Sequence, residues 1–319
     1  TMDSFIYSLN ATVPVFAVML VGYFLRRIGM LTEGFVSVAN KFVFKVCLPC
    51  MLFLDLWATD IRHSFDGEYI GFCAVITLIS ILGIWILAKL FLKDKSQVGA
   101  FVQCSYRSSA AILGIAFIQN IYGDSGMGPL MIIGAVPLYN IFAVTILTLE
   151  SNNEEVRSQK GRIKTTLINI AKNPIIIGIA LGMIASLIQL KLPHMVEKSI
   201  SNLGSMASPL ALIAIGAGFE GKQALARIKP TIVSTLIKLV GLSAIFLPLA
   251  IWFGFRDQKL LALIIMLGSP TTPTAYIMAK NMDGDEVLSS SIIVLTTLLS
   301  SVTLTFWIFL MRYLGYIAG

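Results

Sequence analysis

The fold of this chain is decided by the hexapeptide SPTTPT at residues 269–274, which interrupts a long apolar segment. Pro270 and Pro273 each lack an amide hydrogen and clash with the preceding turn, so a regular helix cannot pass through this stretch. A second hydroxyl-rich stretch, SYRSS at residues 105–109, interrupts another apolar segment. Broken helices at membrane depth occur where they are buried in protein or line a cavity. The two stretches therefore predict a pair of broken membrane helices that build a binding site; the alternative is that they only kink ordinary helices.

The two interruptions occupy equivalent places in a faint internal repeat. Residues that shape the backbone recur after 160 or 161 positions, and residues 107–109 fall at the place of residues 268–270. The recurring pairs are Pro14 and Pro174, Gly22 and Gly182, Pro49 and Pro209, Asn120 and Asn281, Gly123 and Gly284, and Asp124 and Asp285. This pattern is typical of a transporter built from two structural repeats.

The composition places the chain in a lipid bilayer. Hydrophobic residues make up 56% of the 319 residues and charged residues only 13%, which excludes a water-soluble domain of this length. A membrane helix needs about 20 mostly apolar residues. Cutting the chain at its charged and Gly/Pro-rich stretches predicts ten helices, near 5–25, 35–56, 69–92, 98–121, 128–149, 166–189, 200–219, 230–254, 258–281 and 287–314. We therefore predict an all-α membrane protein, because a barrel would show short alternating segments.

The ten predicted helices divide into two five-helix repeats, residues 1–150 and 166–319, joined by a polar linker at residues 151–165. An odd number of helices per repeat makes the second repeat enter the membrane from the opposite side, so the repeats are inverted. Fourteen Lys and Arg fall in the odd-numbered loops and six in the even-numbered loops and C-terminal end. Basic residues gather in cytoplasmic loops, which predicts a multi-pass cell-membrane protein with a cytoplasmic linker and both termini outside. The net charge of +7 then needs no nucleic acid as partner.

Arg107 is predicted to lie well inside the fourth helix. A charge there costs about 2.5–3.5 kcal/mol and usually faces a cavity or a partner. The seventeen acidic residues are all predicted in loops or at helix ends, with Asp55 and Glu220 nearest to apolar surroundings. We therefore expect Arg107 to meet an anion from outside the protein; the alternative is that it caps loose carbonyls or reaches the interface. Three further basic residues lie toward helix ends, where their stems can reach the interface: Lys41, Lys45 and Lys238.

The candidate substrate site combines Arg107 with the two interruptions. Half-helix N-termini present amides to anionic groups, and hydroxyls can donate hydrogen bonds to a carboxylate. We expect Arg107 to supply the positive field and the prolines to keep the second break open. The residues assigned to the site in this way are Arg107, Ser108, Ser109, Ser269, Pro270, Thr271, Thr272 and Pro273.

The segment RSSAAILGIAF at residues 107–117 resembles the fourth-helix signature of the auxin efflux carrier family, which includes plant auxin exporters and bacterial organic-acid permeases. Further matches along the whole chain are Asn173-Pro174, SPLAL at 208–212, Gly216, Pro270, AKN at 279–281 and Gly284-Asp285. The resemblance implies a ten-helix inverted-repeat fold, similar to bile-acid symporters and sodium/proton exchangers, in which helices 4 and 9 cross at their breaks.

The resemblance also implies a division of labour among the helices. Helices one, two, six and seven would form a scaffold that is often a homodimer, while three to five and eight to ten form a mobile unit that moves as an elevator. Many family members have Asn where this chain has Ser109, and Pro where it has Ala116. Asn140 matches an Asn that is frequent in the family, and either supplies a compensating amide to the cavity or links two helices.

These observations predict a secondary carrier for small organic anions, malate-like carboxylates or auxin-like acids, working by alternating access. An enzyme is not expected, because His63 and His194 are far apart in outer loops and no metal-ligand set or catalytic triad can be assembled. No cofactor is expected. Coupling to sodium held by unwound carbonyls, to cotransported protons, or to neither stays open, and the alternatives in function are an anion channel and a nutrient receptor.

Three short motifs have simpler explanations. GAGFEGK at 216–222 begins like a phosphate-binding loop, but Gln223 replaces the Ser or Thr that holds magnesium, and a membrane helix precedes it. CLPC at 47–50 lies in an apolar helix without the βαβ context of a redox motif. The G-x-x-x-G from Gly178 to Gly182 predicts close helix packing, within the chain in preference to a dimer seam.

Overall fold

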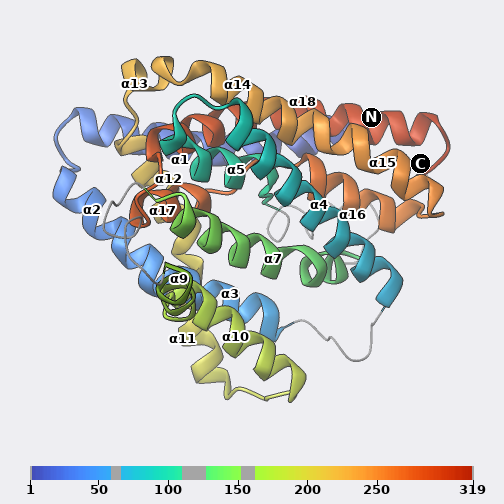
Figure 1. Cartoon of the computed structure of the whole chain (residues 1–319), viewed down its shortest axis with the longest axis horizontal. Helices are drawn as coiled ribbons and strands as arrows, with labels where there is room; N and C mark the ends of the chain where they lie inside the picture. The colour runs from blue at the N-terminus through green and yellow to red at the C-terminus, as the bar shows by residue number, and fades with distance from the viewer. Residues whose placement is uncertain (1, 59–65, 110–126, 152–161, 318–319) are drawn as a thin grey trace.

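The computed structural model describes residues 2–58, 66–109, 127–151 and 162–317, and every regular element in these ranges is a helix (Figure 1). Six helices of the described residues are long and apolar enough to cross a membrane: Glu33–Trp57, Gly67–Phe91, Gly128–Leu149, His194–Ala217, Ile228–Trp252 and Glu286–Tyr313. The all-α membrane class is thereby confirmed. Ala116 and most of the predicted linker lie outside the described residues.

The described helices of the first half match the predicted segments closely. Residues 33–57 form one helix with a π-helical turn in the middle. The elements are α1 (Met2–Arg27), α2 (Glu33–Phe42), the π-helical η1 (Val43–Cys47), α3 (Leu48–Trp57), α4 (Gly67–Phe91), the 3₁₀ turn η2 (Lys95–Gln97), α5 (Val98–Tyr106) and α7 (Gly128–Leu149).

The second half contains shorter helices joined end to end. Residues 228–252 again form one helix with a π-helical turn inside it. The elements are α9 (Arg162–Ala171), α10 (Pro174–Leu187), α11 (His194–Ser205), α12 (Ala207–Ala217), α13 (Gly221–Ala226), α14 (Ile228–Leu236), the π-helical η4 (Ile237–Gly241), α15 (Leu242–Trp252), α16 (Asp257–Gly268), α17 (Thr274–Asn281) and α18 (Glu286–Tyr313).

Side-chain caps fix where several of these helices begin. The side chains of Thr32, Asp66, Asn173 and Asp285 each accept a hydrogen bond from a backbone amide two or three residues further on. Such caps satisfy amides that have no partner within the helix. Polar residues at the apolar boundaries therefore set the ends of the membrane segments.

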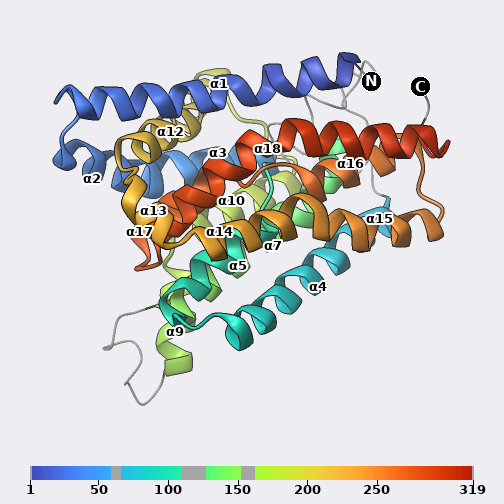
Figure 2. The same cartoon turned by 90° about the horizontal axis from the view of Figure 1, so that it is seen from above.

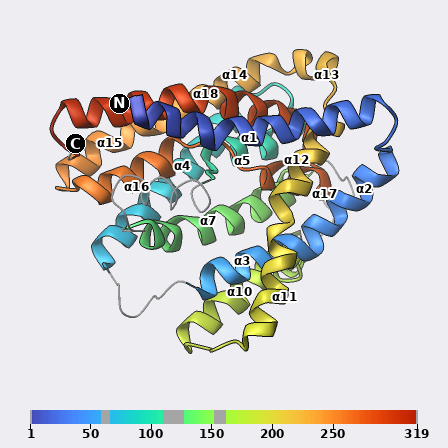
Figure 3. The same cartoon turned by 180° about the vertical axis from the view of Figure 1, so that it is seen from behind.

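Two tight helix crossings are related by the offset of the internal repeat. A Cβ atom on Gly22 of α1 would lie 2.4 Å from the carbonyl oxygen of Ile213 in α12. A Cβ atom on Gly182 of α10 would lie 2.7 Å from the carbonyl oxygen of Phe53 in α3 (Figure 3). Gly22 and Gly182 are 160 residues apart in the sequence, and so are Phe53 and Ile213. The same close contact therefore occurs twice, once from each half of the chain.

The packing of Gly178 confirms that the G-x-x-x-G motif serves a contact within the chain. A Cβ atom there would lie 2.7 Å from the carbonyl oxygen of Pro49 in α3. Only glycine permits this approach of two backbones.

The helices gather in two groups. In one, α3 packs against α10 and α11, and α1 packs against α12. In the other, α4 packs against α5 and α7, and α18 packs against α14, α16 and α17. Figure 2 shows α1 along one side of the molecule and α4 near the opposite side. The two groups meet through α1 and α18 and around the breaks in the chain.

Candidate substrate-binding site

Regular helix ends at both predicted interruptions, and the two segments touch each other. Helix α5 ends at Tyr106, and Arg107 takes an extended conformation with ψ 133°. Helix α16 ends at Gly268, and Ser269 is likewise extended with ψ 159°, before α17 begins at residue 274. The amide of Ser109 donates a hydrogen bond of 3.0 Å to the carbonyl oxygen of Pro270. A backbone amide of the first segment is thus hydrogen-bonded by a backbone carbonyl of the second.

Arg107 lies at this junction and is almost completely buried, with 3% of its surface exposed. Its Nη2 donates to Oδ1 of Asn140 at 2.5 Å, and its Nη1 lies 3.2 Å from the sulfur of Met278. The Nε atom has no hydrogen-bond partner among the described residues, and none of their ion pairs includes Arg107. The guanidinium is therefore positioned by neutral groups and keeps its full positive charge for another partner.

Asn140 lies in the wall of a cavity beside Arg107 and uses both ends of its amide in hydrogen bonds within the protein. Its Oδ1 accepts the hydrogen bond from Arg107 and so links α7 to the end of α5. Its Nδ2 donates to the carbonyl oxygen of Val136, one turn earlier, at 2.9 Å. Because both ends of the amide are engaged, Asn140 holds the guanidinium in one orientation.

A small cavity of about 40 Å³ opens beside Arg107. Typical ligand pockets hold about 300–1,000 Å³, so a substrate would need the lining elements to move apart. The wall comes from α3, from both breaks, from α7 and from the start of α17. It consists of Met51, Leu52, Asp55, Arg107, Ser108, Ser109, Val136, Tyr139, Asn140, Thr272 and Thr274. Five of the nine residues predicted for the site are in this wall.

The other four predicted residues, Ser269, Pro270, Thr271 and Pro273, lie outside the cavity wall. Thr271 donates its hydroxyl to the carbonyl oxygen of Cys104 at 2.7 Å and its amide to the hydroxyl of Thr296 at 3.2 Å. Pro273 directly precedes α17, and the Ser269 hydroxyl is buried without a partner among the described residues. The hydrogen bonds of Pro270 and Thr271 therefore stabilise the backbone of the second break.

Comparison with known proteins identifies the family of this chain. A model of the membrane transport protein family matches residues 7–308. The chain belongs to this family, the auxin efflux carriers. It is therefore a membrane transporter, and its relatives are transporters and not enzymes.

Several curated transporters are similar to this chain over almost their whole length. An uncharacterized transporter of Methanocaldococcus jannaschii is 23% identical over 94% of this chain and 97% of its own. The uncharacterized transporter YfdV of Escherichia coli K12 is 22% identical over 94% and 96%. A protein of Rhizobium meliloti named "Putative malonate transporter" is 23% identical over 94% of both chains.

The cavity of this transporter contains an acidic residue that the sequence did not assign to the site. Asp55, in α3, lines the same cavity as Arg107 and is only partly exposed. Asp55 lies in the last turn of α3, as the sequence predicts, and this end of the helix reaches the cavity. Hydropathy put Asp55 at a helix end, but α3 brings that end against the break. Helical spacing was the available signal, because Met51 and Asp55 are four residues apart and both face the cavity.

Lys238 also differs from its prediction. It was expected to reach the membrane interface, but it is fully buried in η4. Its Nζ donates to the carbonyl oxygen of Leu267 at 2.6 Å and lies 3.5 Å from that of Met266. These carbonyls belong to the last turn of α16, where the helix dipole is negative. The ammonium therefore stabilises the end of a half-helix directly before the second break.

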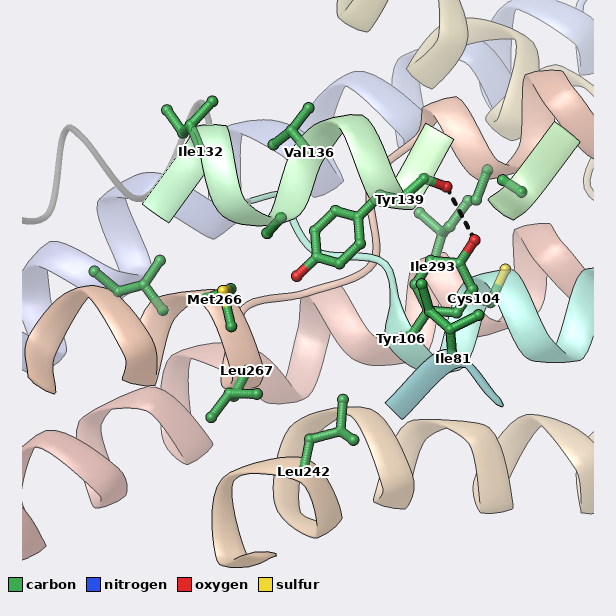
Figure 4. Packing of buried hydrophobic residues seen from close by; sticks show 14 of the residues in the cluster. Ile81, Cys104, Tyr106, Ile132, Val136, Tyr139, Leu242, Met266, Leu267 and Ile293 are labelled. Atoms are coloured by element: carbon green, nitrogen blue, oxygen red, sulfur yellow. Dashed lines mark hydrogen bonds between the residues drawn. The ribbon is translucent and has the colours of Figure 1, made fainter. Parts of the chain in front are cut away.

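Aromatic packing supports the first break from the side of α7. The hydroxyl of Tyr106 donates to the carbonyl oxygen of Tyr139 at 3.0 Å, and the two ring centres are 5.7 Å apart (Figure 4). In this view Tyr139 lies between α7 and the segment that carries Met266. The last residue of α5 is thus fixed to the helix that supplies Asn140.

A second, much larger cavity of about 1,080 Å³ lies between α1, α2, α12 and α17. Its charged lining residues are Arg26, Arg27, Glu33, Glu220, Lys222, Lys280 and Glu286. Arg26 pairs with Glu33 at 2.7 Å, and Lys280 pairs with Glu286. Several of these residues come from segments predicted to be cytoplasmic.

Proposed function

We propose that this transporter is a secondary carrier of small organic anions that works by alternating access. The observation that carries the proposal is Arg107, a buried guanidinium at the contact of two broken helices, held by neutral groups beside a cavity. A guanidinium matches a carboxylate in charge and in its pair of parallel hydrogen bonds. The hydroxyls of Ser109 and Thr272 line the same cavity and offer further donors, whereas the Ser108 hydroxyl donates to the carbonyl oxygen of Met266.

The name of one relative points to the same class of substrate. The Rhizobium meliloti protein carries malonate in its name, and malonate is a small dicarboxylate. Malate-like dicarboxylates and auxin-like acids share the carboxylate that Arg107 would bind. This chain is therefore proposed to act on small carboxylates as a class.

The carrier is proposed to move as an elevator built from two inverted five-helix repeats, with helices 4 and 9 crossing at their breaks. The doubled glycine contact at Gly22 and Gly182 supports two related halves. The group around α1, α3, α10 and α12 would be the scaffold, and the group around α5, α7 and α18 the mobile unit. The cavity lies between α3 of the first group and Arg107 of the second, so sliding would carry the site across the membrane.

The proposal also includes the orientation of the chain in the membrane and its oligomeric state. The apolar segments of the sequence support ten helices with a repeat boundary at the linker 151–165. The distribution of basic residues supports both termini outside the cell membrane. The larger cavity would then give access from the cytoplasm. A homodimer through the scaffold helices completes the proposal.

Counterflow of labelled malonate and labelled malate in proteoliposomes tests the proposal. The unmodified protein should show saturable exchange, and Arg107→Gln should abolish it while the protein stays folded. Arg256→Gln, which changes an exposed arginine away from the cavity, is the matched control. Normal affinity in Arg107→Gln would contradict the role of Arg107. Flux without saturation would indicate a channel, and binding without flux a receptor.

A further inference from the structure

Asp55 places a carboxylate in the wall of the anion cavity. It comes from α3, whereas Arg107, Ser108 and Asn140 come from the elements on the other side. The cavity therefore has an acidic group on the wall of the proposed scaffold and a basic group on the wall of the proposed mobile unit.

We infer that Asp55 is the proton-binding group that couples anion transport to proton movement. The inference rests on the proposed function and names its coupling ion. An ionised Asp55 repels a substrate carboxylate and competes with it for Arg107. Two like charges about 4 Å apart at an effective dielectric constant of about 20 weaken binding roughly a thousandfold. A proton on the Asp55 carboxylate removes this repulsion, so anion and proton occupy the cavity together.

The proton and the anion then cross the membrane in one step. The proton binds to a carboxylate oxygen on the side of entry and leaves from the same oxygen on the side of release. A monocarboxylate carried with one proton moves no net charge. A dicarboxylate dianion carried with one proton moves one negative charge.

Among the described residues, Asp55 is the acidic group of the cavity wall. Within the wall the remaining ionisable side chains are Arg107 and Tyr139. Helix α10 carries no ionisable side chain, and η1 carries the exposed Lys45 and the buried Cys47. Helix α11 carries His194, Glu197 and Lys198, none of them fully buried.

The carbonyl groups at the second break favour a proton over sodium as the coupling ion. A sodium ion there would be held by unwound carbonyls and by the carbonyl end of a half-helix. The carbonyl oxygens of Met266 and Leu267 are at this place, and they accept hydrogen bonds from Ser108 and Lys238. The amine of Lys238 already occupies the place where the dipole of α16 would attract a cation.

The test measures proton movement and anion movement in the same proteoliposomes. A trapped pH dye reports internal acidification while labelled malonate enters, with the membrane potential clamped and protein-free vesicles as the blank. The initial rate for the unmodified protein should fall about tenfold per unit of rising pH once Asp55 is ionised. Asp55→Asn should lose this pH dependence and the acidification per anion. Glu197→Gln, which changes a half-buried carboxylate outside the cavity wall, should keep both.

The outcomes separate this inference from the proposed function. If the unmodified protein takes up malonate into vesicles without internal substrate and produces no acidification, the proton role of Asp55 is overturned. It is also overturned if Asp55→Asn keeps the normal pH dependence of the uptake rate. The dye result on the unmodified protein decides even if Asp55→Asn transports too slowly to measure. If no carboxylate exchanges at any pH, the anion carrier itself fails.

Discussion

Replacing Asn140 by Asp should abolish anion transport without unfolding the protein. The new carboxylate has the shape of the amide, so it still accepts the hydrogen bond from Arg107 that now measures 2.5 Å. It also places a negative charge beside the guanidinium. A substrate carboxylate then has to compete with this charge for Arg107 and is repelled by it. At a separation of about 4 Å and an effective dielectric constant of about 20, this competition is worth about 4 kcal/mol.

An energy of this size corresponds to roughly a thousandfold loss of apparent affinity. The assay is the concentration of unlabelled malonate that half-saturates counterflow, measured for the unmodified protein and for Asn140→Asp. Asn140→Leu provides the comparison, because it removes a hydrogen bond to a charged group, worth about 1.5–3 kcal/mol, without adding a charge. The Asp variant should be the more severely impaired of the two. Equal affinity in Asn140→Asp and the unmodified protein would refute an anion site at Arg107.

Two further predictions concern stability. Gly22→Val should lower the midpoint of thermal unfolding in detergent by an amount equivalent to about 1–3 kcal/mol, because the helices must separate to admit the side chain. Gly71→Ala, where a Cβ meets nothing within 4 Å inside α4, should not lower the midpoint, because alanine favours a helix more than glycine does. A midpoint for Gly22→Val equal to that of the unmodified protein would argue against the tight crossing. The hydrogen bond from Lys259, which pairs with Asp66 at 2.5 Å, is the main cause that lowers the pKa of Asp66. The pair should therefore stabilise the protein above about pH 4 and cease to do so as pH falls through the lowered pKa. The difference in unfolding midpoint between the unmodified protein and Asp66→Asn should vanish in acid. A difference that stays constant with pH would contradict the pairing.

Features that depend on local chemistry could be predicted from the sequence. Two prolines three residues apart, Pro270 and Pro273, predict a break, whereas single prolines such as Pro14 and Pro137 lie inside continuous helices. The extended conformation at Ser269 follows from the proline after it. A charge in an apolar segment has to be buried against protein, and Arg107 is. The exchange of a backbone hydrogen bond between Ser109 and Pro270 was not predictable, because it depends on how two distant segments meet.

Features that depend on tertiary packing could not be predicted. The stem of Lys238 is long enough to reach either the interface or the interior, and only the position of the α16 carbonyls decides between them. Hydropathy ranks Asp55 as a helix-end residue, yet the packing of α3 against the break turns it into a wall of the cavity. Thr271 has the chemistry of a ligand-binding residue, but its hydroxyl and amide are both used to stabilise the break.

The most direct measurement is saturable counterflow of labelled malonate in proteoliposomes that contain the unmodified protein, Arg107→Lys or Arg107→Gln. An anion site at the two breaks predicts exchange by the unmodified protein, weaker exchange by the lysine variant, which keeps the charge but not the paired donors, and none by the glutamine variant. Exchange by the folded glutamine variant with unchanged half-saturation would show that the anion binds elsewhere.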